Sequence, residues 1–184
     1  MLPARTETEI VALARSPRTE DRAEAQGRLV AELQRPLYKL CLHLLGNPAD
    51  AEDALQESLL SACRGLADFR AEAKLSTWAY RIALRTALDL RARRARRNET
   101  STDALDGQAS TMMAVDEHAA LKQRATRLAA AMDTLSAEQR AVLSLFAIDG
   151  LGHQEIGEVL GVPEGTVWSR LHAARKKVAA AMRH

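Results

Sequence analysis

Hydrophobic residues recur at every third or fourth position along most of the chain, which is the spacing of an amphipathic α-helix. Up to residue 97 this pattern predicts helices at about 6–15, 20–45, 48–65 and 75–97. Beyond residue 116 it predicts further helices at about 117–132, 136–149, 153–160 and 164–182. No segment shows a convincing strand pattern, so the sequence indicates an all-α protein.

Residues suited to helix ends support these boundaries. Asn47 and Pro48 fit the N-cap and the first helical position of the helix at 48–65. Ser136, with Gln139 three residues later, has the pattern of a capping box at the start of another helix.

The segment 66–74, LADFRAEAK, lies between two predicted helices and is expected to be a loop. Ser76 or Thr77 suits the N-cap of the helix that follows, because a hydroxyl oxygen can accept a hydrogen bond from the first backbone amides.

A second segment, 98–116, also interrupts the helical pattern. Its first part reads NETSTDALDGQASTMMA and is rich in Ser, Thr, Asp and Gly. A structureless stretch of this length is uncommon inside a compact domain, which favours a flexible acidic linker between two small helical domains at 1–97 and 117–184. A long surface loop within a single domain is the alternative.

Charge is arranged in blocks, although the net charge of the 184 residues is only +2. The stretch 40–63 has four acidic and no basic residues, and 64–97 has ten basic residues against three acidic ones. The stretch 98–117 has five acidic and no basic residues, and 118–184 has nine basic residues against six. Such alternation favours charged partners, and the basic blocks suit a nucleic acid.

Several other classes are excluded. The start of the chain has no apolar stretch typical of a secretory signal, and no window approaches the roughly 20 apolar residues of a membrane span. Two cysteines, Cys41 and Cys63, are too few for a disulfide scaffold, so a cytoplasmic protein without membrane insertion is expected. The five histidines have no spacing typical of a metal site or a catalytic triad, so neither a cofactor nor an enzymatic activity is expected.

The segment 154–175 has the features of a helix–turn–helix. Gly157 allows a second helix to cross closely, and Gly161 permits the sharp turn. The second helix directs one stripe toward the core: Val167, Leu171, Ala174 and Val178. Its other face is polar and basic, which suits entry into a major groove, although an ordinary helical hairpin with a solvated basic face is the alternative.

The helices at 48–65 and 75–97 carry opposite charges. The first presents Asp50, Asp53 and Glu57 on one face, where they form a plausible protein-docking patch or a simple solvated face. The second ends in RARRARR at 91–97, whose five arginines would attract phosphate.

Together these motifs resemble the extracytoplasmic-function (ECF) class of RNA polymerase sigma factors in the sigma-70 family. The N-terminal match includes NPADAEDALQE (47–57), DFR (68–70), STWAYRIA (76–83) and the arginine run. The C-terminal match includes LSAEQRAV (135–142), QEI (154–156) and LGVPEGTVWSRL (160–171). The resemblance implies a sigma-2 domain at 1–97 and a sigma-4 domain at 117–184, with the acidic linker threading the interior of the polymerase.

The resemblance also assigns roles by position. Four residues would bind the clamp helices of the polymerase β′ subunit: Asp50, Asp53, Gln56 and Glu57. The loop and the helix after it would recognise and melt the −10 element with Phe69, Arg70, Lys74, Ser76, Thr77, Trp78, Arg81, Arg85, Arg91, Arg93, Arg94, Arg96 and Arg97.

The C-terminal domain would read the −35 element. The residues expected there are Arg140, Gln154, Glu164, Thr166, Trp168, Ser169, Arg170, His172, Ala173, Arg175 and Lys176. Trp168 stands where relatives often have Lys or Arg. The family further implies contact with the β flap of the polymerase and regulation by an anti-sigma factor.

The sequence therefore predicts a non-catalytic specificity subunit that binds core RNA polymerase and directs it to promoters. One alternative is a stand-alone helix–turn–helix transcriptional regulator whose N-terminal half senses a signal or dimerises. Another is an adaptor that uses the acidic helix and does not bind DNA.

Overall fold

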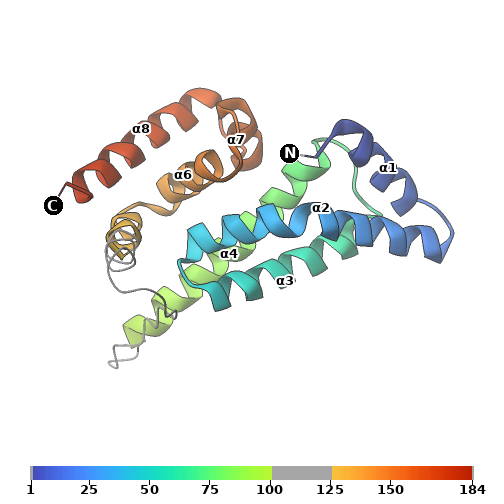
Figure 1. Ribbon diagram of the computed structural model, residues 1–184, viewed down its shortest axis with the longest axis horizontal. Coiled ribbons are helices and arrows are strands. Elements are labelled where there is room, and N and C mark those ends of the chain that lie inside the picture. Colours follow the sequence, from blue (N-terminus) through green and yellow to red (C-terminus); the bar gives the residue numbers. More distant parts are fainter. Residues whose placement is uncertain (1, 101–125, 184) are drawn as a thin grey trace, which may run out of the picture.

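A computed structural model describes the backbone of residues 2–100 and 126–183, and the side chains of these residues except 98–100, 148 and 149. All of the regular structure in these two ranges is helical (Figure 1). The all-α prediction is confirmed.

The N-terminal unit, residues 2–100, contains the helices α1 (Ala4–Ala14), α2 (Thr19–Leu45), α3 (Pro48–Gly65) and α4 (Leu75–Thr100). Helices α2, α3 and α4 pack against one another as a bundle, and α1 packs on α2 near one end of it (Figure 1).

The C-terminal unit, residues 126–183, begins with a helical stretch at 126–133. It continues with α6 (Ala137–Asp149), α7 (His153–Leu160) and α8 (Glu164–Ala181). Both α6 and α7 pack against α8.

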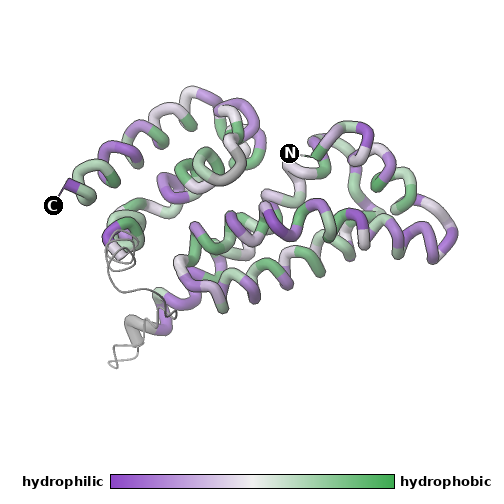
Figure 2. Tube along the Cα trace, viewed as in Figure 1, coloured by the Kyte–Doolittle hydropathy of each residue, from purple (hydrophilic) through white to green (hydrophobic). Residues whose placement is uncertain are grey.

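The core is aliphatic and rich in alanine. Five leucines of α2 are buried, namely Leu29, Leu33, Leu37, Leu40 and Leu44. Many of the positions that α3 and α4 bury are alanines: Ala51, Ala54, Ala62, Ala79, Ala83 and Ala87. Such small side chains let helix backbones approach closely. Hydrophobic and hydrophilic residues are interspersed along the helices, as expected of amphipathic helices that share a core (Figure 2).

The expected caps of α3 and α6 are present. The Asn47 side chain accepts hydrogen bonds from the amides of Ala49 and Asp50 at 2.9 and 3.3 Å. Ser136 and Gln139 form the capping box predicted from their spacing. The neighbouring side chains therefore fix these two helix starts locally.

Two expectations about α4 require correction. Ser76 and Thr77 do not cap it, because the helix begins at Leu75 and both residues lie fully buried in its first turn. The helix also continues to Thr100, so the first three residues of the expected linker are helical. The rest of that linker, and the expected helical residues 117–125, lie outside the described residues.

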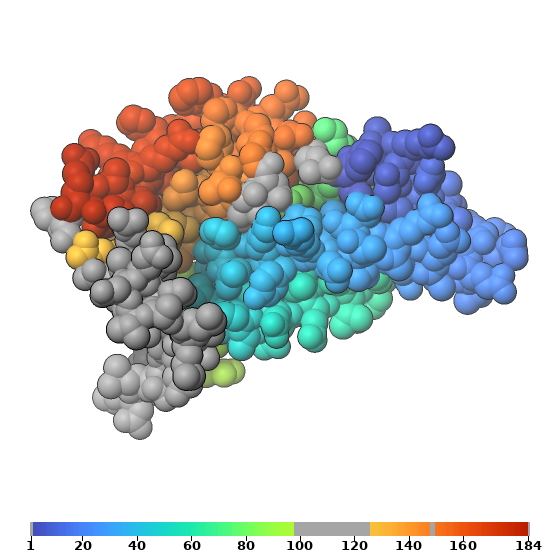
Figure 3. Space-filling view, viewed as in Figure 1, coloured from blue at the N-terminus to red at the C-terminus, as the bar shows by residue number. Residues whose placement is uncertain are grey.

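The two units pack against each other rather than standing apart. Helix α6 contacts α2, and α7 contacts α4. Buried residues of both units belong to one continuous hydrophobic cluster. In the space-filling view the atoms of the C-terminal unit lie directly against α2 (Figure 3).

Candidate functional site

The acidic face of α3 is smaller than the sequence suggested. Asp53, Gln56 and Glu57 are exposed, and Leu60 beside them is 61% exposed. Asp50 is only 5% exposed and forms an ion pair with Arg94 of α4. The structure therefore leaves Asp53, Gln56 and Glu57 accessible to a partner and directs Asp50 toward its own bundle.

The loop between α3 and α4 is anchored by an aromatic side chain. Phe69 is 7% exposed and lies against Trp78, with ring centroids 5.3 Å apart. Arg70 and Lys74 are exposed, and Ala71 adopts a left-handed backbone conformation with φ of 57°. The loop thus presents cations outward from a buried aromatic anchor.

The expected −10 residues at the start of α4 are buried. The hydroxyl of Ser76 donates to the carboxylate of Glu7 at 2.7 Å, and Thr77 is 0% exposed. In this arrangement neither Ser76 nor Thr77 faces solvent. Sequence analysis did not identify Glu7, because Glu7 and its partner Ser76 lie 69 positions apart in the chain.

Beyond that point, α4 presents a row of arginines. Arg81, Arg85, Arg93, Arg94, Arg96 and Arg97 are exposed, and Arg91 is half-buried. Arg91 donates to the carbonyl of Leu44 at 3.2 Å and pairs with Asp133. The remaining arginines follow one long helix, as expected of a surface that could contact a phosphate backbone.

The helix–turn–helix is formed by α7 and α8. A Cβ atom at Gly157 would lie 2.8 Å from the carbonyl oxygen of Val162, so the turn before α8 approaches too closely for any side chain there. Gly161 supplies the turn with a φ of 66°. Val167, Leu171 and Ala174 are buried, as their spacing predicted, whereas Val178 is only half-buried.

The outward face of this motif contains most of the residues expected at the −35 element. The exposed positions are Gln154, Glu164, Trp168, Ser169, His172, Arg175 and Lys176. Thr166, Arg170 and Ala173 are half-buried, and Arg170 pairs with Glu138 of α6 at 3.1 Å. The exposed set lies along α8 and at the start of α7, where one DNA groove could reach it.

An aromatic stack supports this face. The ring of His153 stacks on Trp168 with centroids 4.7 Å apart and on Phe146 at 5.8 Å. The guanidinium of Arg175 lies 4.4 Å from the centre of the Phe146 ring. These residues come from three helices, so no local spacing in the sequence could reveal the stack.

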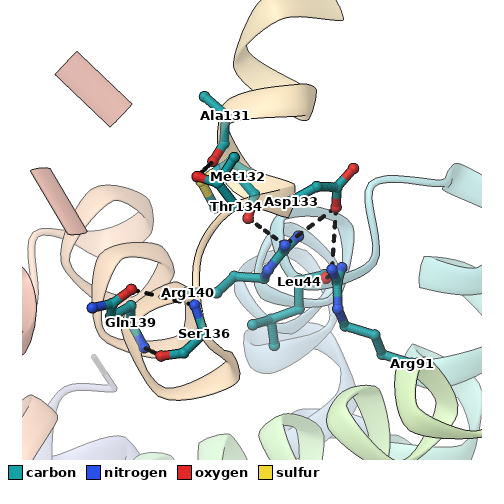
Figure 4. A network of polar contacts seen from close by, with 9 residues as sticks. All are labelled: Leu44, Arg91, Ala131, Met132, Asp133, Thr134, Ser136, Gln139 and Arg140. Carbon is teal, nitrogen blue, oxygen red and sulfur yellow. Dashed lines mark hydrogen bonds and ion pairs between the residues drawn. The ribbon is translucent and has the colours of Figure 1, made fainter. Parts of the chain in front are cut away.

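Arg140 differs from the other expected −35 residues because it is only 2% exposed. Its guanidinium donates to the carbonyl of Met132 and to Asp133, and burial lowers the pKa of this group (Figure 4). Asp133 also pairs with Arg91 at 3.1 Å, so one carboxylate holds arginines from both units.

Further polar contacts link the two units. Lys74 pairs with Glu155 at 3.6 Å, and Arg81 donates to the carbonyl of Glu158 at 3.1 and 2.5 Å. A hollow of about 420 Å³ lies between α4 and the helices α6 and α7. Lys74, Arg81 and Arg91 therefore contact the C-terminal unit in this arrangement.

No catalytic arrangement emerges in the described ranges. Burial raises the pKa of the Cys41 thiol to about 12, and burial also raises the pKa of Cys63, so neither thiol is activated as a nucleophile. Within residues 2–100 and 126–183, no three His, Cys, Asp or Glu side chains are grouped as metal ligands. Every helix there is too short or too polar to cross a lipid bilayer.

Comparison with known proteins decides the family. The family Sigma-70 region 2 matches residues 29–97, and Sigma-70, region 4 matches residues 125–178. The ECF RNA polymerase sigma factor SigM of Mycobacterium tuberculosis is 34% identical over 145 residues, covering 79% of this chain and 70% of SigM. The chain belongs to the ECF RNA polymerase sigma factors. This sigma factor is also 30% identical to SigW of Bacillus subtilis over 148 residues, covering 76% of this chain and 79% of SigW.

Solved structures agree with this assignment. CnrH, in complex with the cytosolic domain of CnrY, matches with a TM-score of 0.70 and 26% identity over 97% of both chains. RpoE of Bartonella quintana, in complex with the anti-sigma factor NepR, matches with a TM-score of 0.65 and 19% identity. That match covers 85% of this chain and 96% of RpoE, and it shows the shared fold.

Proposed function

We propose that this sigma factor is a non-catalytic, cytoplasmic subunit that recruits core RNA polymerase to promoters through three separate surfaces. The observation that carries the proposal is that one chain exposes two such faces: an acidic face on α3 and a polar and basic face on α8. The family places promoter-directed initiation on a sigma-2 and a sigma-4 region, and the chain matches both.

The polymerase contact is assigned to α3. Asp53, Gln56 and Glu57 share one exposed face with Leu60, so a partner there would meet charge beside an apolar side chain. Charged groups of this kind increase the rate and specificity of association, and the exposed leucine adds buried apolar area. The resemblance places the β′ clamp helices on this face.

The −35 contact is assigned to the outward face of α8. Ser169, His172 and Lys176 lie one turn apart along that face, and Trp168 and Arg175 flank it. Polar side chains can read base edges, and the basic ones can bind phosphate.

The −10 contact is assigned to the loop and α4. Arg70, Lys74, Arg81, Arg85 and the arginines of 91–97 supply charge for the phosphate backbone. Phe69, Ser76 and Thr77 are buried, so we assign them to holding the loop in shape, with Trp78 against Phe69.

An anti-sigma factor is the proposed regulator. CnrH was solved with the cytosolic domain of CnrY, and RpoE of Bartonella quintana was solved with the anti-sigma factor NepR. The hollow between α4 and α6–α7 has an apolar floor that includes Leu84 and Val159, which suits a partner helix.

The test is transcription in vitro with core RNA polymerase and genomic promoter fragments. The double variant Asp53→Lys, Glu57→Lys should bind polymerase at least about tenfold more weakly, because reversed charge meets the same partner surface. The charge-matched control is the double variant Glu24→Lys, Glu32→Lys, which changes two exposed residues of α2. It should leave polymerase binding unchanged.

Asp50 is left intact in this test. It is buried and paired with Arg94, so its substitution could reduce binding simply by destabilising the fold. A sigma factor should lose run-off transcription together with polymerase binding while retaining affinity for −35 DNA. Polymerase binding that survives the double variant would refute the assignment to α3. Specific DNA binding without any stimulation of initiation would favour the stand-alone regulator.

A further inference from the structure

Helix α1 lies outside both stretches that match the sigma-70 families, which begin at residues 29 and 125. None of the residues assigned above to polymerase or promoter contacts belongs to it. The structure nevertheless connects α1 to the loop at 66–74 and to the start of α4 through two long-range polar contacts.

The first contact joins Glu7 to the N-terminus of α4. Its two carboxylate oxygens accept hydrogen bonds from the amide of Leu75 at 3.3 Å, the amide of Ser76 at 3.1 Å and the hydroxyl of Ser76 at 2.7 Å. Lys74 precedes the helix and has no side-chain acceptor, so α4 has no local cap of the usual kind. Glu7 supplies the missing acceptors, and its negative charge faces the positive end of the helix dipole.

The second contact holds the middle of the loop. The guanidinium of Arg15 donates to the carbonyl oxygen of Phe69 at 2.9 Å. Two residues later, Ala71 has a left-handed φ of 57°, a conformation that residues other than glycine adopt rarely and at an energetic cost. Arg15 and Glu7 restrain the chain on both sides of this residue.

Between these contacts lies a hollow of about 320 Å³. One wall is formed by Glu7, Thr8 and Val11 of α1 and by Arg15 directly after it, and the opposite wall is the loop, including Phe69 and Ala71. The position of α1 therefore sets both the shape of the loop and the space beside it.

We propose that α1 is a clamp that positions the loop for promoter opening, with Glu7 and Arg15 as its positioning residues. The proposal rests on the proposed role of the loop at the −10 element. Melting requires that an unstacked base be held, and a binding surface does this well only when its geometry is fixed before the DNA arrives. Glu7 and Arg15 act through the loop by fixing that geometry.

Two variants test the clamp, each with a control on the same stretch of chain. Glu7→Gln presents an amide to three donors and retains the size of the side chain, whereas Arg15→Ala removes the donor to Phe69. Glu9→Gln is the control for the first, since Glu9 pairs only with the exposed Arg5 and Arg28 in the described residues. Arg18→Ala is the control for the second, since Arg18 pairs with exposed Glu20.

The measurements use the full chain with core polymerase and a promoter that the wild-type protein opens. Glu7→Gln and Arg15→Ala should each slow open-complex formation by about tenfold, the effect of losing one hydrogen bond to a charged group. They should also reduce the preference for the native −10 element over a mutated one. Affinity for polymerase and for −35 duplex should remain within about twofold, and the controls should match wild type.

Hydrogen exchange provides a reading that does not depend on transcription. The amides of Leu75 and Ser76 should exchange faster in Glu7→Gln, with α2 and α3 unchanged. If these amides exchanged faster but promoter opening were normal, the clamp proposal would be refuted and the proposed function would be unaffected. Loss of polymerase binding in parallel with opening would also overturn it, because α1 would then serve the fold as a whole. A wild-type protein that opens no promoter would instead refute the proposed function.

Discussion

Gly157 shows how one residue limits the geometry of the DNA-reading motif. A methyl group there would lie 2.8 Å from the carbonyl oxygen of Val162, whose amide is itself bonded to the carbonyl of Gly157 at 3.0 Å. Because backbone atoms on both sides are fixed, Gly157→Ala should destabilise the protein by about 1–3 kcal/mol. Thermal unfolding followed by circular dichroism measures this change.

Gly165 is the matched control for that substitution. It lies at the start of α8, where a methyl group would meet no atom within 4 Å beyond its chain neighbours and the backbone of its own helix, and its φ is not positive. Gly165→Ala should therefore raise stability by up to about 1 kcal/mol through helix propensity. Equal destabilisation by the two substitutions would show that close packing at Gly157 is not the cause.

Trp168 is the exposed end of the aromatic stack. It is 59% exposed while its ring rests on His153, so its removal should cost affinity for DNA and little stability. Trp168→Ala should weaken binding to a −35 duplex by about tenfold, in the range of one lost base contact. Fluorescence anisotropy with labelled duplex measures it, and Met182→Ala, at the far end of α8, serves as the control. If Trp168→Ala bound the duplex as tightly as the wild type, Trp168 would not be part of the DNA contact.

Single residues were predictable where their partners are close in sequence. Asn47 and Ser136 bond to amides within three residues, so their capping roles follow from spacing alone. Glu7 caps a helix 68 positions away, and no pattern within the sequence encodes that distance. Asp50 shares a helical face with Asp53 by spacing, yet the neighbouring α4 covers only the first of the two.

At the scale of elements, Asp50 and Arg94 tie α3 to α4. The carboxylate is almost fully buried, and the guanidinium is about half exposed. Asp50→Asn removes the charge that the arginine meets and should lower the free energy of unfolding by about 1–2 kcal/mol. Urea denaturation measures it. The control Asp53→Asn changes an exposed carboxylate of the same helix and should stay within about 0.5 kcal/mol of wild type.

The helices themselves were largely predictable, because a 3.6-residue period survives in any packing that buries one face. It was harder to predict which side chains these helices bury. The pattern predicted a buried stripe of Ala51, Leu55, Leu59 and Ala62 in α3. Ala51 and Ala62 are fully buried as predicted, but Leu55 and Leu59 are only half-buried, and Ala54 is buried instead. Closely packed helices favour small residues at the contact, and an alanine gives little signal in a hydrophobic pattern.

At the scale of the whole molecule, the sequence indicated two domains but not their contact. Leu84 and Leu88 of α4 and Val159 and Leu160 of α7 each read as ordinary apolar positions of their own helices. The structure brings them around one hollow between the units. Amphipathic spacing indicates which face is buried but not which helix buries it.

This compact arrangement is too small for a promoter. Positions −35 and −10 are about 25 base pairs apart, which is about 85 Å at 3.4 Å per base pair. By comparison, even α2, the longest helix described, has 27 residues and spans only about 40 Å at 1.5 Å per residue. We therefore expect the two units to separate before both elements are bound, which would also release Lys74, Arg81 and Arg91, three of the residues proposed to contact DNA.

Asp133 is the point at which this separation can be tested. It lies between Arg91 of α4 and the buried Arg140, so Asp133→Arg would place a third cation beside two others (Figure 4). Repulsion next to a desolvated guanidinium should drive the units apart. Small-angle X-ray scattering should show a clearly larger radius of gyration for this variant than for the wild-type protein. Glu32→Arg, with the same change of charge on α2, should remain compact. A compact Asp133→Arg would show that the apolar contacts between α2, α4, α6 and α7 hold the units together without this carboxylate, and that separation awaits the polymerase itself.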